Sequence, residues 1–202
     1  MTVLEFLKAA AGNSPIEWIA VVFGIVSVYL SVRENIWSWP TAIVNVALYV
    51  YIFLYAKLYA DMGLQVVYVG INAYGWWNWL YGGANHSELR VTRITAPQTV
   101  VLTAIGAAFA VALWKFLAKN TDAALPWADS ALTAASLVAQ YLLTKKVLEN
   151  WAIWVAADVG YITLYIYKGL NPTAFLYAVF LLLSVMGWIE WKRSIRMEQP
   201  AS

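Results

Sequence analysis

The stretch Gly75-Trp76-Trp77-Asn78-Trp79 occurs a second time, in looser form, as Gly187-Trp188-Ile189-Glu190-Trp191. A shift of about 112 residues superposes the two stretches. The same shift places Tyr29 on Tyr141, Trp39 on Trp151 and Tyr49 on Tyr161. Self-similarity at a fixed spacing indicates a chain built from structural repeats. The sequence therefore predicts two related halves.

Composition indicates lipid as the solvent of the folded chain. Of its 202 residues, 62% are hydrophobic and only 12% are charged, against roughly 25% charged residues in a soluble domain. A bilayer-spanning helix needs about 20 mostly apolar residues. Seven runs qualify: residues 15–32, 37–56, 58–81, 95–116, 126–144, 151–167 and 172–191. We therefore predict an all-α integral membrane protein with seven transmembrane helices.

The shift also aligns the first three runs with the last three, and the run 95–116 lies between them. Because each repeat has an odd number of helices, one linker helix makes both repeats run in the same direction. Gly106 and Ala110 in that linker are small enough to let a neighbouring helix approach closely. We expect a SWEET-like 3+1+3 fold in a single transmembrane domain, 1–202, with repeats at 15–81 and 126–191. Such repeats place a substrate site near the bilayer midplane, which favours transport.

Basic residues predict the orientation of the chain in the membrane. With seven spans, one side holds Lys8, Lys57, Lys115, Lys119 and Lys168, and the other holds Arg33, Arg90, Arg93, Lys145, Lys146, Lys192, Arg193 and Arg196. Cytoplasmic loops carry the excess of Lys and Arg. The C-terminus is therefore predicted to be cytoplasmic and the N-terminus outside.

Asp158 is the sharpest functional candidate, because it lies near the centre of the sixth run without Lys or Arg within a helical turn. A charge at that depth costs about 2.5–3.5 kcal/mol, so the carboxylate should face a cavity or a partner. It is either an anionic contact for a cationic substrate or a proton, or a carboxyl group that bonds two helices. Trp154, one turn away, could add cation–π attraction.

Amide and aromatic side chains supply the other candidates. Asn45, Gln65 and Asn72 lie within apolar runs, where their amides need partners. They are either ligand contacts or interhelical hydrogen bonds, and for Gln140 the second interpretation is favoured. Most of the 12 Trp and 13 Tyr residues fit the aromatic belts that form at membrane interfaces without any ligand.

Several chemistries are not encoded. The sequence has no phosphate-binding loop and no Gly-x-Ser-x-Gly or His-Glu-x-x-His motif. It has no cysteine, and its one histidine, His86, cannot build a metal site alone. No basic stripe suggests nucleic acid. We expect no enzyme activity, no metal and no cofactor.

Two segments resemble the Pnu family of bacterial vitamin transporters. They are Asn35-Ile36-Trp37-Ser38-Trp39-Pro40 with Asn45, Leu48-Tyr49 and Phe53, and Lys57-Leu58-Tyr59-Ala60-Asp61-Met62-Gly63-Leu64-Gln65 with Tyr74-Gly75-Trp76-Trp77-Asn78-Trp79-Leu80. The resemblance extends from about Gly24 to Trp191. It implies the SWEET-like fold, a bacterial cytoplasmic (inner) membrane location, and vitamin uptake by facilitated diffusion with alternating access. A cytoplasmic vitamin kinase would trap the substrate. Asn45, Gln65, Trp76, Asn78 and Trp79 fall in the family's shared motifs.

The resemblance leaves the vitamin open. Nicotinamide riboside, the best-known family substrate, and thiamine both carry a fixed positive charge on an aromatic ring, which suits Asp158 with Trp154. Riboflavin is neutral and larger, and ranks third. A SWEET-like membrane receptor that binds a ligand without transport is the alternative from another class. A homo-oligomer is compatible with the sequence.

Overall fold

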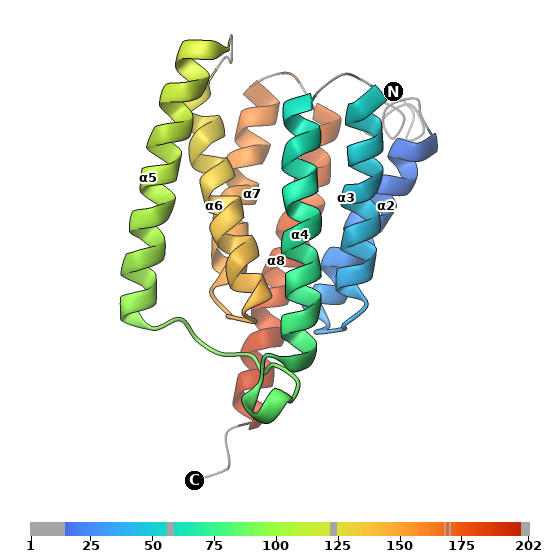
Figure 1. Ribbon diagram of the computed structural model, residues 1–202, viewed down its shortest axis with the longest axis vertical. Helices are drawn as coiled ribbons and strands as arrows, with labels where there is room; N and C mark the ends of the chain where they lie inside the picture. The colour runs from blue at the N-terminus through green and yellow to red at the C-terminus, as the bar shows by residue number, and fades with distance from the viewer. Residues whose placement is uncertain (1–14, 56–58, 122–124, 168, 170, 199–202) are drawn as a thin grey trace.

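The computed structural model describes residues 15–55, 59–121, 125–167, 169 and 171–198. In this part of the chain seven α-helices form one bundle (Figure 1), which confirms the predicted number. They are α2 (Pro15–Val32), α3 (Ser38–Tyr55), α4 (Tyr59–Tyr81), α5 (Ala96–Asn120), α6 (Pro126–Thr144), α7 (Asn150–Tyr167) and α8 (Asn171–Glu198), with a short 3-10 helix η1 (Ala84–His86) after α4. We call the end at which α8 terminates the C-terminal end of the bundle, and the opposite end the N-terminal end.

Apolar surface identifies the bundle as a membrane domain. Four helices are long and apolar enough to cross a membrane, namely α2, α3, α5 and residues Thr173–Met197 of α8. The other three, α4, α6 and α7, carry buried polar side chains such as Asn72, Ser136 and Asp158. No residue of α5 is buried, and its exposed side chains include Val100 and Ile105. Exposed apolar area on this scale requires a lipid environment.

Two helices run further than their apolar stretches predict. The expected ends were residues 116 and 191, whereas α5 continues to Asn120 and α8 to Glu198. Hydropathy tracks contact with lipid, but a helix can continue into water because its backbone hydrogen bonds are internal. In the α8 extension Arg193 pairs with Glu190, one turn earlier, at 3.1 Å.

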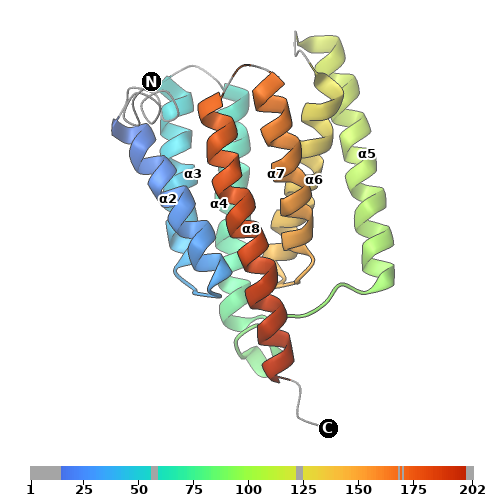
Figure 2. The ribbon, with the colours of Figure 1, turned by 180° about the vertical axis from the view of Figure 1, so that it is seen from behind.

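The helices pack as two groups of three. Helices α2, α3 and α4 pack in chain order, and α6, α7 and α8 do the same. The groups meet where α2 contacts α8 and where α4 contacts α6 (Figures 1 and 2). Helix α5 lies outside them against α6. There Gly106 is so close to α6 that a Cβ atom would be 3.2 Å from Val138, in agreement with the predicted role of small residues in this helix.

Four buried indoles, Trp39, Trp79, Trp151 and Trp191, form a layer towards the C-terminal end, which we call the tryptophan layer. The rings of Trp39 and Trp79 pack in a T-shaped arrangement, with centroids 5.3 Å apart and planes at 87°. Trp151 and Trp191 repeat this arrangement at 5.4 Å and 86°. The Trp79 indole N–H donates to the Leu143 carbonyl and that of Trp191 to the Ser31 carbonyl, both at 3.0 Å. Each bond joins the two helix groups.

The turns below this layer are also duplicated at the same spacing. Glu34 follows α2 and Lys146 follows α6, and both adopt a left-handed backbone with φ of 54°. The two side chains pair with each other, with Lys146 Nζ 2.8 Å from Glu34 Oε2. Gly75 and Gly187 match as well, since a Cβ atom at either would overlap the indole of Trp39 or Trp151. The same contacts therefore occur once in each half of the sequence.

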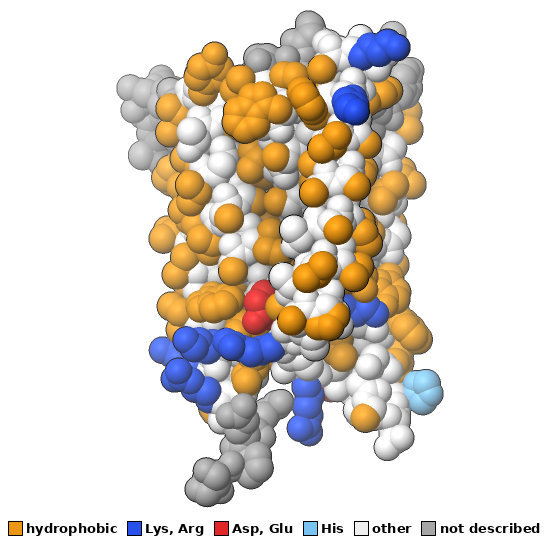
Figure 3. Space-filling model, turned by 90° about the vertical axis from the view of Figure 1, so that its left-hand side faces the viewer, with side chains coloured by type: hydrophobic (Ala, Val, Ile, Leu, Met, Phe, Trp, Pro, Cys, Tyr) orange, Lys and Arg blue, Asp and Glu red, His pale blue; other side chains and the backbone are white. Residues whose placement is uncertain are grey.

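Basic side chains gather at the C-terminal end, below a band of apolar surface (Figure 3). Those that flank the helix ends there are Arg33, Arg90, Arg93, Lys145, Lys146, Lys192, Arg193 and Arg196. At the N-terminal end the described residues include Lys115 and Lys119. Lys8, Lys57 and Lys168, which the orientation prediction also used, lie outside the described residues.

Candidate functional site

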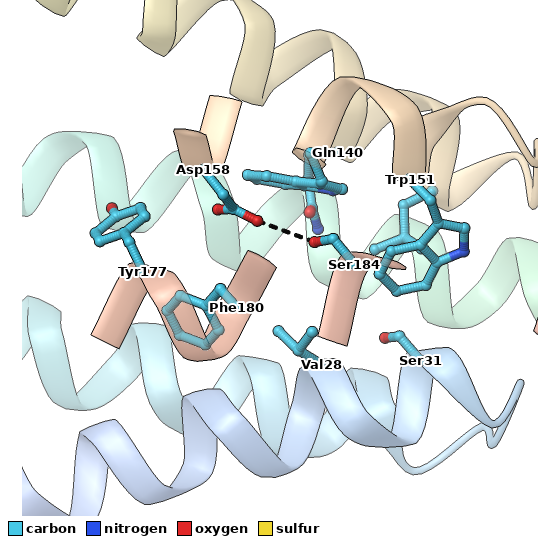
Figure 4. A pocket seen from close by; sticks show the side chains of 10 residues that line it. Val28, Ser31, Gln140, Trp151, Asp158, Tyr177, Phe180 and Ser184 are labelled. Atoms are coloured by element: carbon cyan, nitrogen blue, oxygen red, sulfur yellow. Dashed lines mark hydrogen bonds between the residues drawn. The ribbon is translucent and has the colours of Figure 1, made fainter. Parts of the chain in front are cut away.

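A central cavity of about 220 Å³ lies between α2, α6, α7 and α8 (Figure 4). Its lining consists of Val28, Ser31, Gln140, Leu143, Trp151, Trp154, Asp158, Tyr177, Phe180 and Ser184. The lining combines aromatic rings with a few polar groups, a composition typical of small-molecule sites. Since α2 and α8 belong to different helix groups, the cavity lies where the groups meet.

Asp158 provides the only carboxylate of this lining. Its side chain is buried, with a relative exposure of 2%. One carboxylate oxygen accepts a hydrogen bond of 3.0 Å from the Ser184 hydroxyl (Figure 4). No ion pair among the described residues includes Asp158. A carboxylate has about four acceptor positions, so this group keeps hydrogen-bonding capacity for a ligand.

Trp154, Tyr177 and Phe180 supply the aromatic faces near this carboxylate. Tyr177 also belongs to a cluster with Tyr161 and Tyr165, at centroid distances of 4.7 and 5.2 Å. Aromatic faces attract cations, and a carboxylate attracts them more strongly. The central cavity therefore has the chemistry to hold a flat cationic ring.

Asn72 and Gln140 link the two helix groups beside the central cavity. The Gln140 amide N–H donates to the Asn72 side-chain oxygen at 2.9 Å, joining α6 to α4. Gln140 lines the cavity, whereas Asn72 is buried behind it. This is the interhelical bond that the sequence favoured for Gln140, although Gln140 also faces the cavity.

A second, outer cavity of about 630 Å³ lies towards the N-terminal end. Its lining consists of Glu17, Val21, Gly24, Asn45, Tyr49, Ile52, Phe53, Gln65, Tyr165, Thr173, Leu176, Tyr177 and Phe180. The Asn45 amide donates to the Ala20 carbonyl at 2.6 Å and so ties α3 to α2. Tyr177 and Phe180 line both cavities, which makes the two cavities neighbours.

Four of the predicted site residues, Asn72 among them, lie outside both linings. Asn78 donates to the Thr144 carbonyl at 2.8 Å, and Trp79 belongs to the tryptophan layer. Both join α4 to the end of α6. Trp76 is 39% exposed. The structure thus brings Trp154 and Asp158 together in the central cavity, and Asn45 and Gln65 together in the outer cavity. Asn78 and Trp79 instead pack between α4 and α6 at the C-terminal end of the bundle.

Sequence reasoning missed Tyr177, Phe180 and Ser184. A signal for two of them was present in the repeat. Shifting the candidates Gln65 and Asn72 by about 112 residues leads to Tyr177 and Ser184, and both line the central cavity. The residue types differ between the halves, so a search for polar side chains alone passes over Tyr177.

Apolar helices exposed to lipid, around an internal cavity with a buried carboxylate, define a multi-spanning membrane protein with room for a small solute. The chain belongs to the nicotinamide mononucleotide transporter family, whose sequence model matches residues 14–193. This match confirms the resemblance to the Pnu family, and the family is one of transporters.

Individual relatives cover most of the chain. The nicotinamide riboside transporter PnuC of Escherichia coli (strain K12) is 26% identical over 96% of this chain and 93% of its own length. The riboflavin/roseoflavin transporter RibM of Streptomyces davaonensis is 24% identical, over 89% of this chain and 85% of its own. A crystal structure of the vitamin B3 transporter PnuC superposes with a TM-score of 0.71 at 25% identity, covering 97% of this chain and 91% of that chain.

Proposed function

We propose that the protein takes up a vitamin by facilitated diffusion, and that the vitamin is nicotinamide riboside. The observation that carries the proposal is the buried Asp158 carboxylate, which has no cationic partner among the described residues and shares a cavity with Trp154. The E. coli relative is named for nicotinamide riboside, and RibM for riboflavin and roseoflavin.

Charge ranks the candidate vitamins. The pyridinium ring of nicotinamide riboside and the thiazolium ring of thiamine are permanent cations, and a cation over an aromatic face gains about 0.5–2 kcal/mol. Asp158 would add a direct charge contact. Riboflavin is neutral, so a buried carboxylate gives it no comparable advantage. Thiamine therefore remains the alternative within the family, and riboflavin ranks third.

The proposed mechanism is alternating access in a SWEET-like 3+1+3 fold. Repeat one spans residues 15–81, the linker helix 95–116 and repeat two 126–191. The duplicated tryptophan contacts and the two matched turns support this division. Hydrogen bonds between the helix groups close the C-terminal end, while the outer cavity lies towards the opposite end. This combination is what an outward-facing state requires.

The proposed setting is the bacterial inner membrane, with the C-terminus in the cytoplasm and the N-terminus outside. Clustering of Lys and Arg at the C-terminal end supports this orientation. Facilitated diffusion needs no coupled ion. A cytoplasmic kinase that phosphorylates the vitamin would keep the inward gradient, because the added phosphate is negatively charged and Asp158 would repel it.

Calorimetry on the purified full chain tests the substrate, with nicotinamide riboside, thiamine and riboflavin as separate ligands. We expect nicotinamide riboside to bind most tightly. A preference for riboflavin would contradict the charge argument. Reduced nicotinamide riboside, which has the same shape but no positive charge, is the matched control and should bind more weakly.

Flux into liposomes separates a transporter from a receptor. With the protein reconstituted, labelled nicotinamide riboside should equilibrate across the bilayer without an ion gradient. Tight binding without flux would overturn the transport proposal in favour of a receptor of the same fold. Flux that depends on a sodium or proton gradient would overturn facilitated diffusion.

A further inference from the structure

Helix α5 leaves a cleft beside α6 that the proposed transport cycle does not use. At the C-terminal end this cleft is a cavity of about 690 Å³. Its lining consists of Thr92, Arg93, Thr95, Pro97, Gln98, Val101, Leu102, Tyr141, Leu142, Lys145 and Val147. Two cationic side chains and several hydroxyl groups therefore surround a space at the level where basic residues gather (Figure 3).

The charges of this cavity are only partly compensated. Lys145 donates to the Tyr74 hydroxyl, a neutral partner, and lies 5.0 Å from the centroid of that ring. Arg93 is 3.8 Å from one oxygen of Glu149, and its side chain is 58% exposed. The other Glu149 oxygen accepts from the Ile94 backbone N–H at 2.9 Å. One acidic group against two basic groups leaves a single positive charge, which a phosphodiester would neutralise.

An apolar groove continues from this cavity towards the membrane interior. It has a volume of about 350 Å³ and lies between α5 and α6. Small and aliphatic side chains dominate its lining, among them Gly106, Ala110 and Val138. Leu102 and Leu142 line both the groove and the basic cavity, so the two spaces adjoin. The basic cavity has the chemistry to bind a phospholipid headgroup, and the apolar groove beside it has the chemistry to bind an acyl chain.

We propose that the cleft between α5 and α6 binds an anionic phospholipid. Its phosphodiester lies between Arg93 and Lys145, and one acyl chain follows the groove past Gly106 and Ala110. Basic pockets between transmembrane helices at the membrane surface recognise anionic headgroups in this way. The lipid would hold α5, which has no buried residue, against the second helix group.

The test is lipid retention by the purified full chain in native mass spectrometry. The probes are dioleoyl phosphatidylglycerol and dioleoyl phosphatidylcholine, which share acyl chains and differ in net charge. We expect preferential retention of phosphatidylglycerol. The double variant Arg93→Gln/Lys145→Gln should lower its retention by about 30-fold, since each basic residue near a headgroup contributes about fivefold.

The matched control is Arg33→Gln/Arg90→Gln. It removes two charges at the same end, and neither residue lines the cleft. Arg33 is also the counterpart of Lys145 at the repeat spacing. This variant should retain the lipid, whereas Ala110→Leu, which narrows the groove, should lose it with the basic residues intact.

Results of three kinds would overturn the proposal. The first is equal loss in the two double variants, or equal retention of both lipids. The second is displacement by glycerol phosphate at low millimolar concentration, because a headgroup alone would then suffice. The third is an oligomer that dissociates in Arg93→Gln/Lys145→Gln and carries no lipid, because a second copy of the chain would then cover the cleft.

Discussion

Replacing Asp158 with Asn removes the charge from the central cavity and keeps the shape of the side chain. The Asn amide oxygen can still accept the 3.0 Å hydrogen bond from Ser184, so the thermal stability should change little. The pyridinium nitrogen of nicotinamide riboside has no N–H, so the ring meets Asp158 as a charge contact, and hydrogen bonds to charged groups, at about 1.5–3 kcal/mol, set the scale for its contribution. We therefore expect the Kd of nicotinamide riboside to rise by about 10- to 150-fold.

The Coulomb estimate agrees with this range. Opposite unit charges 4 Å apart attract by about 4 kcal/mol at an effective dielectric constant of 20. Part of that is offset because Asp158 and the cation must both lose water on binding. The measured loss should therefore fall below 4 kcal/mol and above the value for a neutral hydrogen bond.

Calorimetry with two ligands isolates the charge. Reduced nicotinamide riboside has no ring charge, so Asp158→Asn should raise its Kd less than that of the cationic ligand, by no more than the about 2- to 13-fold expected for a neutral hydrogen bond. Glu190→Gln is the control for carboxylate removal in general, since Glu190 pairs with Arg193 away from both cavities. An unchanged Kd for the cationic ligand, or an equal loss for both ligands, would refute the reasoning.

Three further predictions concern the packing, the outer cavity and the orientation in the membrane. Gly75→Ala and Gly187→Ala should each lower the Tm in a thermal unfolding assay, by an overpacking cost of about 1–3 kcal/mol, because each added methyl overlaps an indole. Gly70→Ala, which has open space around it, is the control and should leave the Tm unchanged or slightly raised, because Ala favours a helix over Gly. Equal Tm values for all three variants would contradict the packing. Asn45→Leu should abolish uptake in the liposome assay, because it removes the hydrogen bond to Ala20 and a polar group of the outer cavity. Normal uptake would show that Asn45 serves only helix packing. A reporter fused to the C-terminus should be active in the cytoplasm, and an external signal would reverse the proposed orientation.

Hydrophobic runs predicted the helices because a spanning helix must satisfy its backbone internally and face lipid. The helices 15–32 and 126–144 agree with the structure at both ends. Where the chain leaves the membrane this argument stops applying, so the last turns of α5 and α8 were missed. The repeat spacing aligned Trp39 with Trp151 and Trp79 with Trp191, and the structure shows that the two pairs pack with geometries that agree within 0.1 Å and 1°.

The candidate site was harder to predict, because one residue type serves both binding and packing. Asp158 could be identified from the sequence, because a charged side chain in the middle of an apolar helix is costly unless it faces a cavity or a partner. Asn78 and Trp79 share a motif with the family, yet their side chains bond the end of α6. Ser184 and Tyr177 are ordinary residues for a membrane helix, and only the packing of α8 against α7 brings them to Asp158.

The proposed mechanism requires the C-terminal end of the bundle to open, so the strength of the contacts that close this end matters. Among the side-chain contacts that join the helix groups there are the Trp79, Trp191 and Asn78 hydrogen bonds, the Lys145–Tyr74 bond and the Lys146–Glu34 pair. Each such hydrogen bond stabilises by about 0.5–1.5 kcal/mol net, so these bonds together favour the closed end by a few kcal/mol. A preference of that size leaves the open state populated at the per cent level or below. Facilitated diffusion needs both states within thermal reach. The indoles of the tryptophan layer, which join the two helix groups at Trp79 and Trp191 with centroids 5.8 Å apart, therefore have to find equivalent apolar contacts in the open state.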